Sequence, residues 1–298
     1  MRIAHVNNTA GIASILSKHQ RFLGNEADVF VFNKYLYRQF GGEKVNFYFP
    51  LSRWKFFKKL KTYDVWHYHY PYGSLRKGLE NRKENRIYLK HYHGDDLRGK
   101  YDSDFCLVST PDLLEFAPYG EWFPTPLDLE SLAYNPQNFN VLSSSKKPIV
   151  AHYPHYRLYQ KYEDLYSNTL QQLQKEGKCE IVTIFDIPRS EVLKILSSCD
   201  LVVGKILPQI GWFGKFELES MALGKPVVAY VNTELFQRYK PPIYNTTKDT
   251  FKSDLESILS DIEEQHKLSK AGRLYVEKYH SANNLLRQLD RAYSRSQQ

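Results

Sequence analysis

The sequence predicts an α/β protein with two doubly wound, Rossmann-like domains, and three observations support this expectation. Short apolar runs alternate with helix-forming stretches in the first half of the chain, and the same alternation begins again near residue 148. Such alternation is typical of a parallel sheet with helices on both faces. The length of 298 residues suits two domains of about 150 residues. Residues 124–148 are rich in Pro, Asn and Ser, which indicates a linker.

The expected boundaries follow from this pattern. Residues 1–125 form the first domain, 126–148 the linker and 149–282 the second domain. In the first domain, strands are expected at 2–6, 27–32, 65–69, 86–91 and 105–108, and helices at 12–23, 54–61, 74–81 and 111–116. In the second, strands are expected at 148–152, 179–185, 201–205 and 227–231, and helices at 189–198, 216–223 and from 249 onward.

The net charge of +8 is concentrated in one part of the chain. Residues 51–100 contain 13 Lys and Arg but only 5 Asp and Glu, an excess equal to that of the whole chain. A localised basic patch indicates an anionic partner. Within it, Arg53–Lys61 interleaves bases with aromatic residues, so a helix here could lie on an anionic membrane surface. The alternative is a helix that packs Trp54, Phe57 and Leu60 on the sheet. Nucleic acid is less favoured, because no aromatic-rich recognition motif is present.

Cysteine usage and hydropathy favour a cytoplasmic protein. Cys106, Cys179 and Cys199 are odd in number and widely spaced, which argues against a disulfide framework and for a reducing compartment. No apolar run approaches the roughly 20 residues of a membrane span. The chain opens on a strand pattern rather than on a signal peptide. We therefore expect a cytoplasmic protein, peripheral to the membrane if Arg53–Lys61 binds lipid.

Two His-x-His patterns stand at the ends of predicted strands, in Val65–His69 and in Leu89–Asp96. Alternate residues of a strand share a face, so paired histidines could bind zinc. No further His, Asp or Glu residues complete a metal site at a recognisable spacing, and we therefore expect no metal. A metal-dependent hydrolase built on these strands is a remote alternative that a chelator would reveal.

The segment Gly211–Tyr230 indicates a loop, a short helix, a turn and a buried strand. Its glycines leave backbone N–H groups open at a helix N-terminus, which suits phosphate. Glu219 lies about one turn into that helix, where its carboxylate could accept two hydrogen bonds from a ribose diol. The alternative is a connecting loop followed by a first-turn glutamate that only complements the helix dipole.

The residues Glu219-Ser-Met-Ala-Leu-Gly-Lys-Pro-Val227 resemble the second half of the donor-site motif of GT-B glycosyltransferases, specifically the retaining enzymes of family four. The first half departs from the motif, because the family's first glutamate falls on Gly211. Glu217 is close by, but we do not assign it the missing role. The resemblance implies that Glu219 holds the donor ribose and that the preceding loop contacts the donor. The loop residues concerned are Ile210, Gly211, Trp212, Phe213, Gly214 and Lys215.

The first domain contains further matches. Asp64–His69 is similar to the family's Asp-apolar-apolar-His-x-His strand, and His93-Gly-Asp95 to its His-Gly-x-Asp strand end. By resemblance His93 faces the donor sugar, with Asp95 beside it. Gly11 follows the first strand, where the family has a glycine-bearing loop that faces the donor phosphates; a plain tight turn is the alternative. Asp102-Ser-Asp104 spells the metal-binding motif of the other glycosyltransferase fold, and we interpret it as a strand cap.

The second domain matches in the same order. Arg157 and Lys161 follow its first strand, where the family clamps the donor diphosphate with an arginine and a lysine. Two cations there would stabilise the leaving group as the glycosidic bond breaks; a solvated basic turn is the alternative. Ile187 and Pro188 lie in the turn where the family holds the nucleobase. The last helix of the family packs on the N-terminal domain, and residues 283–298 are expected to do so.

The resemblance implies a nucleotide-diphosphate-sugar glycosyltransferase that retains the anomeric configuration and needs no metal or other cofactor. His93, Arg157 and Lys161 are the expected catalytic residues. The base, the sugar and the acceptor, whether glycan, lipid or protein, are left open. One alternative is a catalytically degenerate nucleotide-sugar-binding protein, which the glycine at position 211 supports. Another is a sugar-nucleotide epimerase on the same fold.

Overall fold

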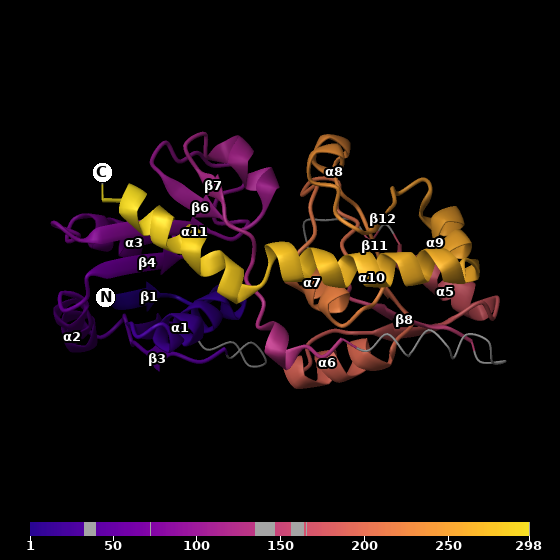
Figure 1. Cartoon of the computed structure of the whole chain (residues 1–298), viewed down its shortest axis with the longest axis horizontal. Coiled ribbons are helices and arrows are strands. Elements are labelled where there is room, and N and C mark those ends of the chain that lie inside the picture. Colours follow the sequence, from indigo (N-terminus) through magenta and orange to yellow (C-terminus); the bar gives the residue numbers. More distant parts are fainter. Residues whose placement is uncertain (33–39, 72, 135–146, 156–163, 165, 298) are drawn as a thin grey trace. The chain divides into compact units, whose positions relative to one another are not determined.

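The computed structural model describes residues 1–32, 40–71, 73–134, 147–155, 164 and 166–297. The chain divides into two compact units, each built on one parallel sheet (Figure 1). The N-terminal unit is Met1–Asp128 with Tyr279–Gln298, and the C-terminal unit is Leu129–Lys278. The chain therefore passes between the units twice. The two parallel sheets confirm the predicted fold class.

The described part of the N-terminal unit contains seven parallel strands in the order β3-β2-β1-β4-β5-β6-β7. They are β1 (Arg2–Val6), β2 (Glu26–Val31), β3 (Glu43–Lys44), β4 (Val65–His69), β5 (Ile87–Tyr92), β6 (Cys106–Val108) and β7 (Glu121–Trp122). The five strands expected from the sequence are confirmed to within one residue at either end. The edge strands β3 and β7 were not expected, because two residues are too short to show an alternating pattern.

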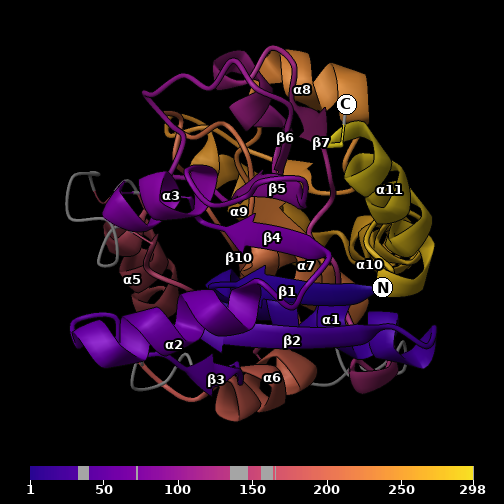
Figure 2. The same ribbon diagram turned by 90° about the vertical axis from the view of Figure 1, so that its left-hand side faces the viewer.

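The helices of the N-terminal unit are α1 (Ile12–Phe22), α2 (Pro50–Leu60), α3 (Gly73–Glu80) and α11 (Ala282–Arg295), with 3-10 turns η1 (Thr9–Gly11) and η2 (Pro111–Phe116). The helix expected at 111–116 is thus a 3-10 turn. Helix α2 begins four residues before its expected start, because Pro50 is favoured in the first turn of a helix. Helices α1 and α11 cover one face of the sheet, and α2 and α3 cover the other (Figure 2).

The alternation of side chains along each strand decides which residues meet which helices. Ile3 and Val65 pack in the core under α1 and α11. Ala4 and Trp66, one position later, pack in the core under α2 and α3. Because residues two positions apart share a face, the histidines that follow Ile3 and Val65 at that spacing are directed beneath α1 and α11.

The described part of the C-terminal unit contains five parallel strands in the order β12-β11-β10-β8-β9. They are β8 (Ile149–His152), β9 (Glu180–Thr183), β10 (Leu201–Val203), β11 (Val227–Ala229) and β12 (Tyr244–Asn245). Its helices are η3 (Leu129–Ser131), α5 (Ser167–Lys175), α6 (Arg189–Ser198), α7 (Lys215–Ala222), α8 (Thr233–Tyr239), α9 (Phe251–Ser260) and α10 (Ile262–Tyr279). The strand order reverses between β8 and β10, and ligands of open α/β sheets bind at such a switch point, beyond the carboxyl ends of the strands.

A buried ion pair between Lys90 and Asp102 lies on the face of the N-terminal sheet that α3 covers. The Lys90 ammonium donates to both carboxylate oxygens of Asp102 at 2.7 and 2.6 Å, and both side chains are buried. Asp102 also accepts hydrogen bonds from the Tyr92 hydroxyl and the Asp104 N–H. Burial alone would raise the pKa of Asp102, but the bonds from Lys90 and Tyr92 outweigh it and hold that pKa below its usual range. The Asp-x-Asp pair therefore caps the approach to β6, as expected, and also neutralises a buried lysine.

Replacing Asp102 by alanine is expected to destabilise the protein by about 3–5 kcal/mol, because the Lys90 charge would stay buried without its main partner. Urea unfolding measures the loss. Asp104→Ala is the matched control: Asp104 contacts the same ammonium at 2.8 Å, but its side chain is 73% exposed, so about 1 kcal/mol or less is expected. Equal effects of the two substitutions would contradict this account.

The three cysteines are buried free thiols. Across the described ranges, no helix combines the length and the apolar character needed to cross a membrane.

Candidate active site

Glu217 joins the end of β10 to the start of α7. Its buried carboxylate accepts hydrogen bonds from the N–H of Lys205 at 2.6 Å and from the N–H of Gly214 at 2.8 Å. A Cβ on Gly204 would lie 2.5 Å from the Glu217 side chain, so only glycine permits this approach. Glu217 is therefore a structural residue. The N–H of Gly214 is already bonded and, contrary to expectation, is not open to a phosphate.

Glu219 is held by an arginine that sequence reasoning did not single out. Oε1 of Glu219 accepts hydrogen bonds from Nε and a terminal nitrogen of Arg189, at 3.0 and 2.8 Å. The Lys215 ammonium lies 3.7 Å from the same oxygen. Burial lowers the pKa of Lys215, and Glu219 opposes this shift. The Arg189 side chain is 37% exposed whereas that of Glu219 is 7% exposed. The carboxylate is thus fixed in a buried position, with charged partners on one of its oxygens.

The turn predicted to hold a nucleobase lies directly before Arg189. Pro188 is exposed, and its carbonyl accepts the Glu191 N–H at 2.9 Å, so it caps the first turn of α6. Ile187 is half-buried, and Asp186 has a positive φ of 56°. Because Arg189 is the first residue of α6, its bond to Glu219 brings this turn beside α7. The sequence alone does not predict this contact.

Gly211 is required by the backbone. Its φ is +70°, a conformation that favours glycine, and its carbonyl accepts the Asn232 N–H at 3.0 Å. A Cβ at this position would lie 3.2 Å from Asn232 Cβ. A glutamate here would therefore be strained. The neighbouring Ile210, Trp212 and Phe213 are buried, with the Trp212 and Phe213 rings stacked at 4.6 Å.

Lys205 places a positive charge beyond the carboxyl end of β10. A Cβ on Gly214 would lie 2.8 Å from Lys205 Nζ, which places that ammonium at the start of α7. His155, buried after β8, lies 3.7 Å from Glu217, and burial followed by the charge of Lys205 holds its pKa well below the ordinary value. Arg157 and Lys161, the predicted diphosphate clamp, lie outside the described residues. Lys205 was not predicted as a site residue.

In the N-terminal unit, the turn after β5 is held by Asp96. Its carboxylate accepts the N–H of His93 at 3.0 Å and the N–H of Gly94 at 2.7 Å. Burial raises the pKa of Asp96 to about 6, against the lowering effect of these bonds. The predicted neighbour Asp95 instead lies 3.6 Å from Arg98. Asp96 therefore fixes the backbone at His93, a role that the sequence motif assigned to no residue.

Five histidines meet under α1 and α11. Four of them are the two His-x-His pairs, His67/His69 and His91/His93. The fifth is His5, because β1 lies beside β4 in the sheet, and its Nδ1 is hydrogen-bonded to His69 Nε2 at 3.0 Å. Burial lowers the pKa of His5 to about 4 and that of His93 to about 3. The pKa values of His67, His69 and His91 lie well below the ordinary value for the same reason. All five imidazoles are therefore neutral near pH 7.

Gly11 serves the packing of the loop after β1. It caps α1 with a φ of +76°, and a Cβ there would lie 2.7 Å from the Phe40 ring. The glycine thus permits a tight turn and a close approach of Phe40. Its predicted role beside the donor phosphates stays a prediction.

No family model matches this chain, and no curated protein matches it. Solved structures do. HepE from Anabaena, in complex with UDP-glucose, superposes with a TM-score of 0.66 at 15% identity over 99% of each chain. Sucrose-phosphate synthase from Thermosynechococcus elongatus gives 0.65 at 14% identity, again over 99% of each chain. The chain has the GT-B fold. A putative UDP-N-acetylglucosamine 2-epimerase from Listeria monocytogenes also matches, with a TM-score of 0.55 at 11% identity over 97% of this chain and 94% of that one.

Within the GT-B fold, the C-terminal unit places most of the predicted donor residues in segments that follow the carboxyl ends of its strands. The turn at Ile187 and Pro188 follows β9, and the loop that leads to Glu219 follows β10. Sequence reasoning missed Arg189 and Lys205, although each is a cation adjoining a segment that had been singled out. His93 lies in the other GT-B unit, and both of its ring nitrogens have partners there, Ser109 Oγ at 2.6 Å and His69 Nδ1 at 3.1 Å.

Proposed function

We propose that the protein is a glycosyltransferase that moves a sugar from a nucleotide-diphosphate sugar to an acceptor with retention of configuration, without a metal ion. One observation supports it most. Glu219 presents a buried carboxylate that Arg189 fixes from one side, beyond a switch point of a GT-B sheet. A ribose diol is a suitable ligand for such a group, because two hydroxyls can donate to one carboxylate. HepE, which shares the fold, was solved with UDP-glucose and with UDP.

The proposed roles divide between binding and leaving-group stabilisation. Glu219 holds the ribose, and Ile187 and Pro188 border the base. Arg157 and Lys161, by resemblance, neutralise the diphosphate as it departs, with Lys205 as a further cation near the start of α7. Cations aimed at a developing negative charge stabilise the transition state directly. His93 shapes the sugar side, and holding acceptor and donor together supplies the rest of the rate enhancement.

A panel of nucleotide sugars, screened by thermal shift with and without EDTA and then assayed for nucleotide release with candidate acceptors, tests the proposal. We expect one donor to raise Tm and to release its nucleotide equally in EDTA. Stabilisation without release by any acceptor would identify a binding protein. Conversion of the donor into a second nucleotide sugar without an acceptor would identify an epimerase, the alternative that the Listeria structure favours. No stabilisation by any nucleotide sugar would overturn the proposal.

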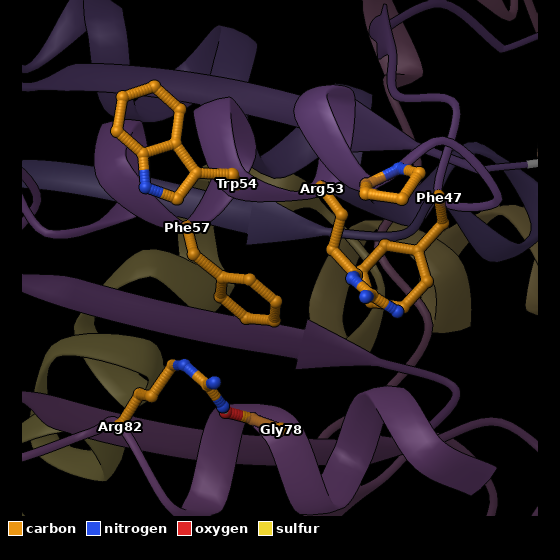
Figure 3. Close-up of a pocket in the computed structure, with 7 residues that line it drawn as sticks. Phe47, Arg53, Trp54, Phe57, Gly78 and Arg82 are labelled. Carbon is orange, nitrogen blue, oxygen red and sulfur yellow. The ribbon is translucent and has the colours of Figure 1, made fainter.

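We further propose that the protein is cytoplasmic and docks on an anionic membrane through α2. Phe56 and Leu60 bury the inner side of the helix, and Phe57 packs beside them. Trp54, which the alternative interpretation packs on the sheet, is 57% exposed, so that part of the alternative is wrong. Beside it lies a hollow of about 410 Å³ (Figure 3), lined by Phe47, Pro50, Arg53, Trp54, Phe57, Gly78 and Arg82. The Arg82 guanidinium lies over the Phe57 ring at 4.7 Å. Aromatic rings beside cations suit the headgroup region.

Changing Lys55, Lys58, Lys59 and Lys61 to glutamine is expected to weaken binding to phosphatidylglycerol vesicles roughly tenfold to thirtyfold. Each lysine near an anionic surface contributes about 1 kcal/mol, but Lys59 and Lys61 already pair with glutamates. Vesicle sedimentation measures the change. The matched control makes the same four-charge change in the C-terminal unit, at Lys194, Lys252, Lys267 and Lys270. Equal binding by the two variants would exclude α2 as the contact.

A further inference from the structure

Eight side chains form a closed ring of hydrogen bonds inside the N-terminal unit. Five are the strand histidines, and the others are Gln20 of α1, Ser109 after β6 and Tyr293 of α11. The successive contacts are His5 Nε2 to Gln20 Oε1 (2.7 Å), His5 Nδ1 to His69 Nε2 (3.0 Å), His69 Nδ1 to His93 Nε2 (3.1 Å), His93 Nδ1 to Ser109 Oγ (2.6 Å), Ser109 Oγ to His91 Nε2 (3.0 Å), His91 Nδ1 to His67 Nε2 (3.2 Å), His67 Nδ1 to the Tyr293 hydroxyl (3.0 Å) and that hydroxyl to Gln20 Nε2 (3.1 Å). We call this set the histidine circuit.

The circuit is complete in its donors and acceptors. A neutral imidazole has one N–H and one bare nitrogen, a hydroxyl donates once, and an amide offers an oxygen on one side and an N–H on the other. Eight bonds need eight protons, and the eight groups supply one each. Because every member gives one bond and receives one, all the bonds must run in the same direction around the circuit. A second proton on any imidazole would place two donors face to face.

Gln20 sets that direction. Its oxygen faces His5 and its N–H faces Tyr293, so His5 must donate from Nε2 and receive at Nδ1. The same condition passes along the circuit, and every imidazole carries its proton on Nε2. His93 donates to His69 and accepts from Ser109. The tautomer of His93 is thus fixed by an amide three hydrogen bonds away.

The ring positions agree with directed hydrogen bonds. In the three direct pairs, His5/His69, His69/His93 and His67/His91, the ring centroids are all 5.3 Å apart, while the bonded nitrogens are 3.0, 3.1 and 3.2 Å apart. The difference is about the sum of two ring radii, so both nitrogens lie near the line of centres and the N–H points at its acceptor. The same histidines form two groups of three whose nitrogens lie within 4.8 Å of one another, and a bound cation would have to displace the protons of these bonds.

We propose that the histidine circuit is a tautomer lock that positions His93, with Gln20 and Tyr293 as its positioning residues. Neither ring nitrogen of His93 can give up its hydrogen-bond partner without opening the circuit. His93 therefore acts by its fixed shape and position and transfers no proton. The consequence for catalysis, though not the lock itself, rests on the proposed function. Two helices far from the end of β5 then determine how the residue at the sugar side is held.

Nitrogen NMR of the full chain labelled in histidine tests the lock directly. At pH 7.5 the five imidazoles should be neutral and protonated on Nε2. Gln20→Leu removes the amide that sets the direction, and the Tyr293 hydroxyl can then either donate to His67 or accept from it, so His67 and His93 should each show a mixture of tautomers. Tyr88→Phe is the matched control, because it removes a buried hydroxyl that has no hydrogen-bond partner in the described structure; it should leave all five signals unchanged. Five unaltered tautomers in Gln20→Leu would overturn the lock.

Gln20→Glu tests the proton count independently. A carboxylate supplies no proton, so the eight bonds lack one, and the variant should take up one proton. We expect it on an imidazole, which is more basic than a carboxylate, and NMR should show one imidazolium at pH 7.5. Five neutral imidazoles in the original tautomer, together with an ionised carboxylate at position 20 seen in its carbon chemical shift, would overturn the count. One equivalent of tightly bound transition metal in the purified protein would also overturn the circuit.

Turnover separates the lock from its catalytic consequence. In the presence of a donor identified as above, Gln20→Leu should lower kcat about tenfold and leave the donor KM unchanged, because most of the predicted nucleotide contacts lie in the other unit. An unchanged kcat alongside altered tautomers would overturn the positioning role. If the wild-type protein turns over no donor, the proposed function fails, and the NMR result still decides the lock.

Discussion

Replacing Glu219 by alanine is expected to weaken the binding of a nucleotide sugar roughly tenfold to a hundredfold. A hydrogen bond to a charged group contributes about 1.5–3 kcal/mol, and the variant loses at least one such bond to the ribose. The fold should persist, because the partner left behind, Arg189, is 37% exposed and can be hydrated. Isothermal titration with the nucleoside diphosphate of the identified donor measures the change. An unchanged affinity would exclude the ribose role.

Two further variants separate direct contact from positioning. Arg189→Ala keeps the carboxylate but releases the oxygen that Arg189 holds, so a smaller loss of affinity is expected than in Glu219→Ala. Glu234→Ala removes an exposed glutamate from the first turn of α8 and serves as the control, with no expected change. If Arg189→Ala were as harmful as Glu219→Ala, the arginine itself would contact the donor.

The fold could be predicted because its information is local. Strands β1 and β4 are buried on both faces along almost their whole length, and such short runs between helix-forming stretches are visible in the sequence itself. Strands β3 and β7 escaped prediction because two residues carry no period. The resemblance at Glu219 identified a glutamate but not what fixes it, since Arg189 lies thirty positions earlier and reaches it only through the order of the strands.

The histidine circuit shows the same limit. Its two His-x-His pairs stood out in the sequence, whereas His5 was a single histidine in an apolar strand. Pairing of β1 with β4 sets His5 opposite His67, and pairing of β4 with β5 sets His69 opposite His91. Tyr293 arrives from the last helix, 226 positions from its partner His67. Such a cluster depends on the order of the strands in the sheet and on the packing of α11 in the N-terminal unit, and no local sequence pattern predicts either.

Lowering the pH from 7.5 to 5.5 is expected to destabilise the N-terminal unit by on the order of 7 kcal/mol. Each circuit histidine has a folded pKa below its unfolded value of 6.5. Its stabilising effect is therefore complete above pH 6.5 and is lost as the pH falls toward the folded pKa, at about 1.4 kcal/mol per pH unit. His280, whose pKa burial lowers to about 4, adds to the loss, and Asp96, whose pKa is raised to about 6, opposes it. Because domains are stable by about 5–15 kcal/mol, this unit should unfold between about pH 5 and 6.

Tryptophan fluorescence can follow the two units separately. Of the four tryptophans, Trp54, Trp66 and Trp122 lie in the N-terminal unit and Trp212 in the other. A Trp212→Phe variant therefore reports the N-terminal unit alone, and a variant that keeps only Trp212 reports the C-terminal unit. The second should keep its native signal to a lower pH, because fewer buried neutral histidines lie there and His155 is the one with a clearly lowered pKa among the described residues. A native signal from the N-terminal tryptophans at pH 4.5 would show that the five imidazoles accept protons without loss of structure, and would contradict a circuit that is complete only when each imidazole is neutral.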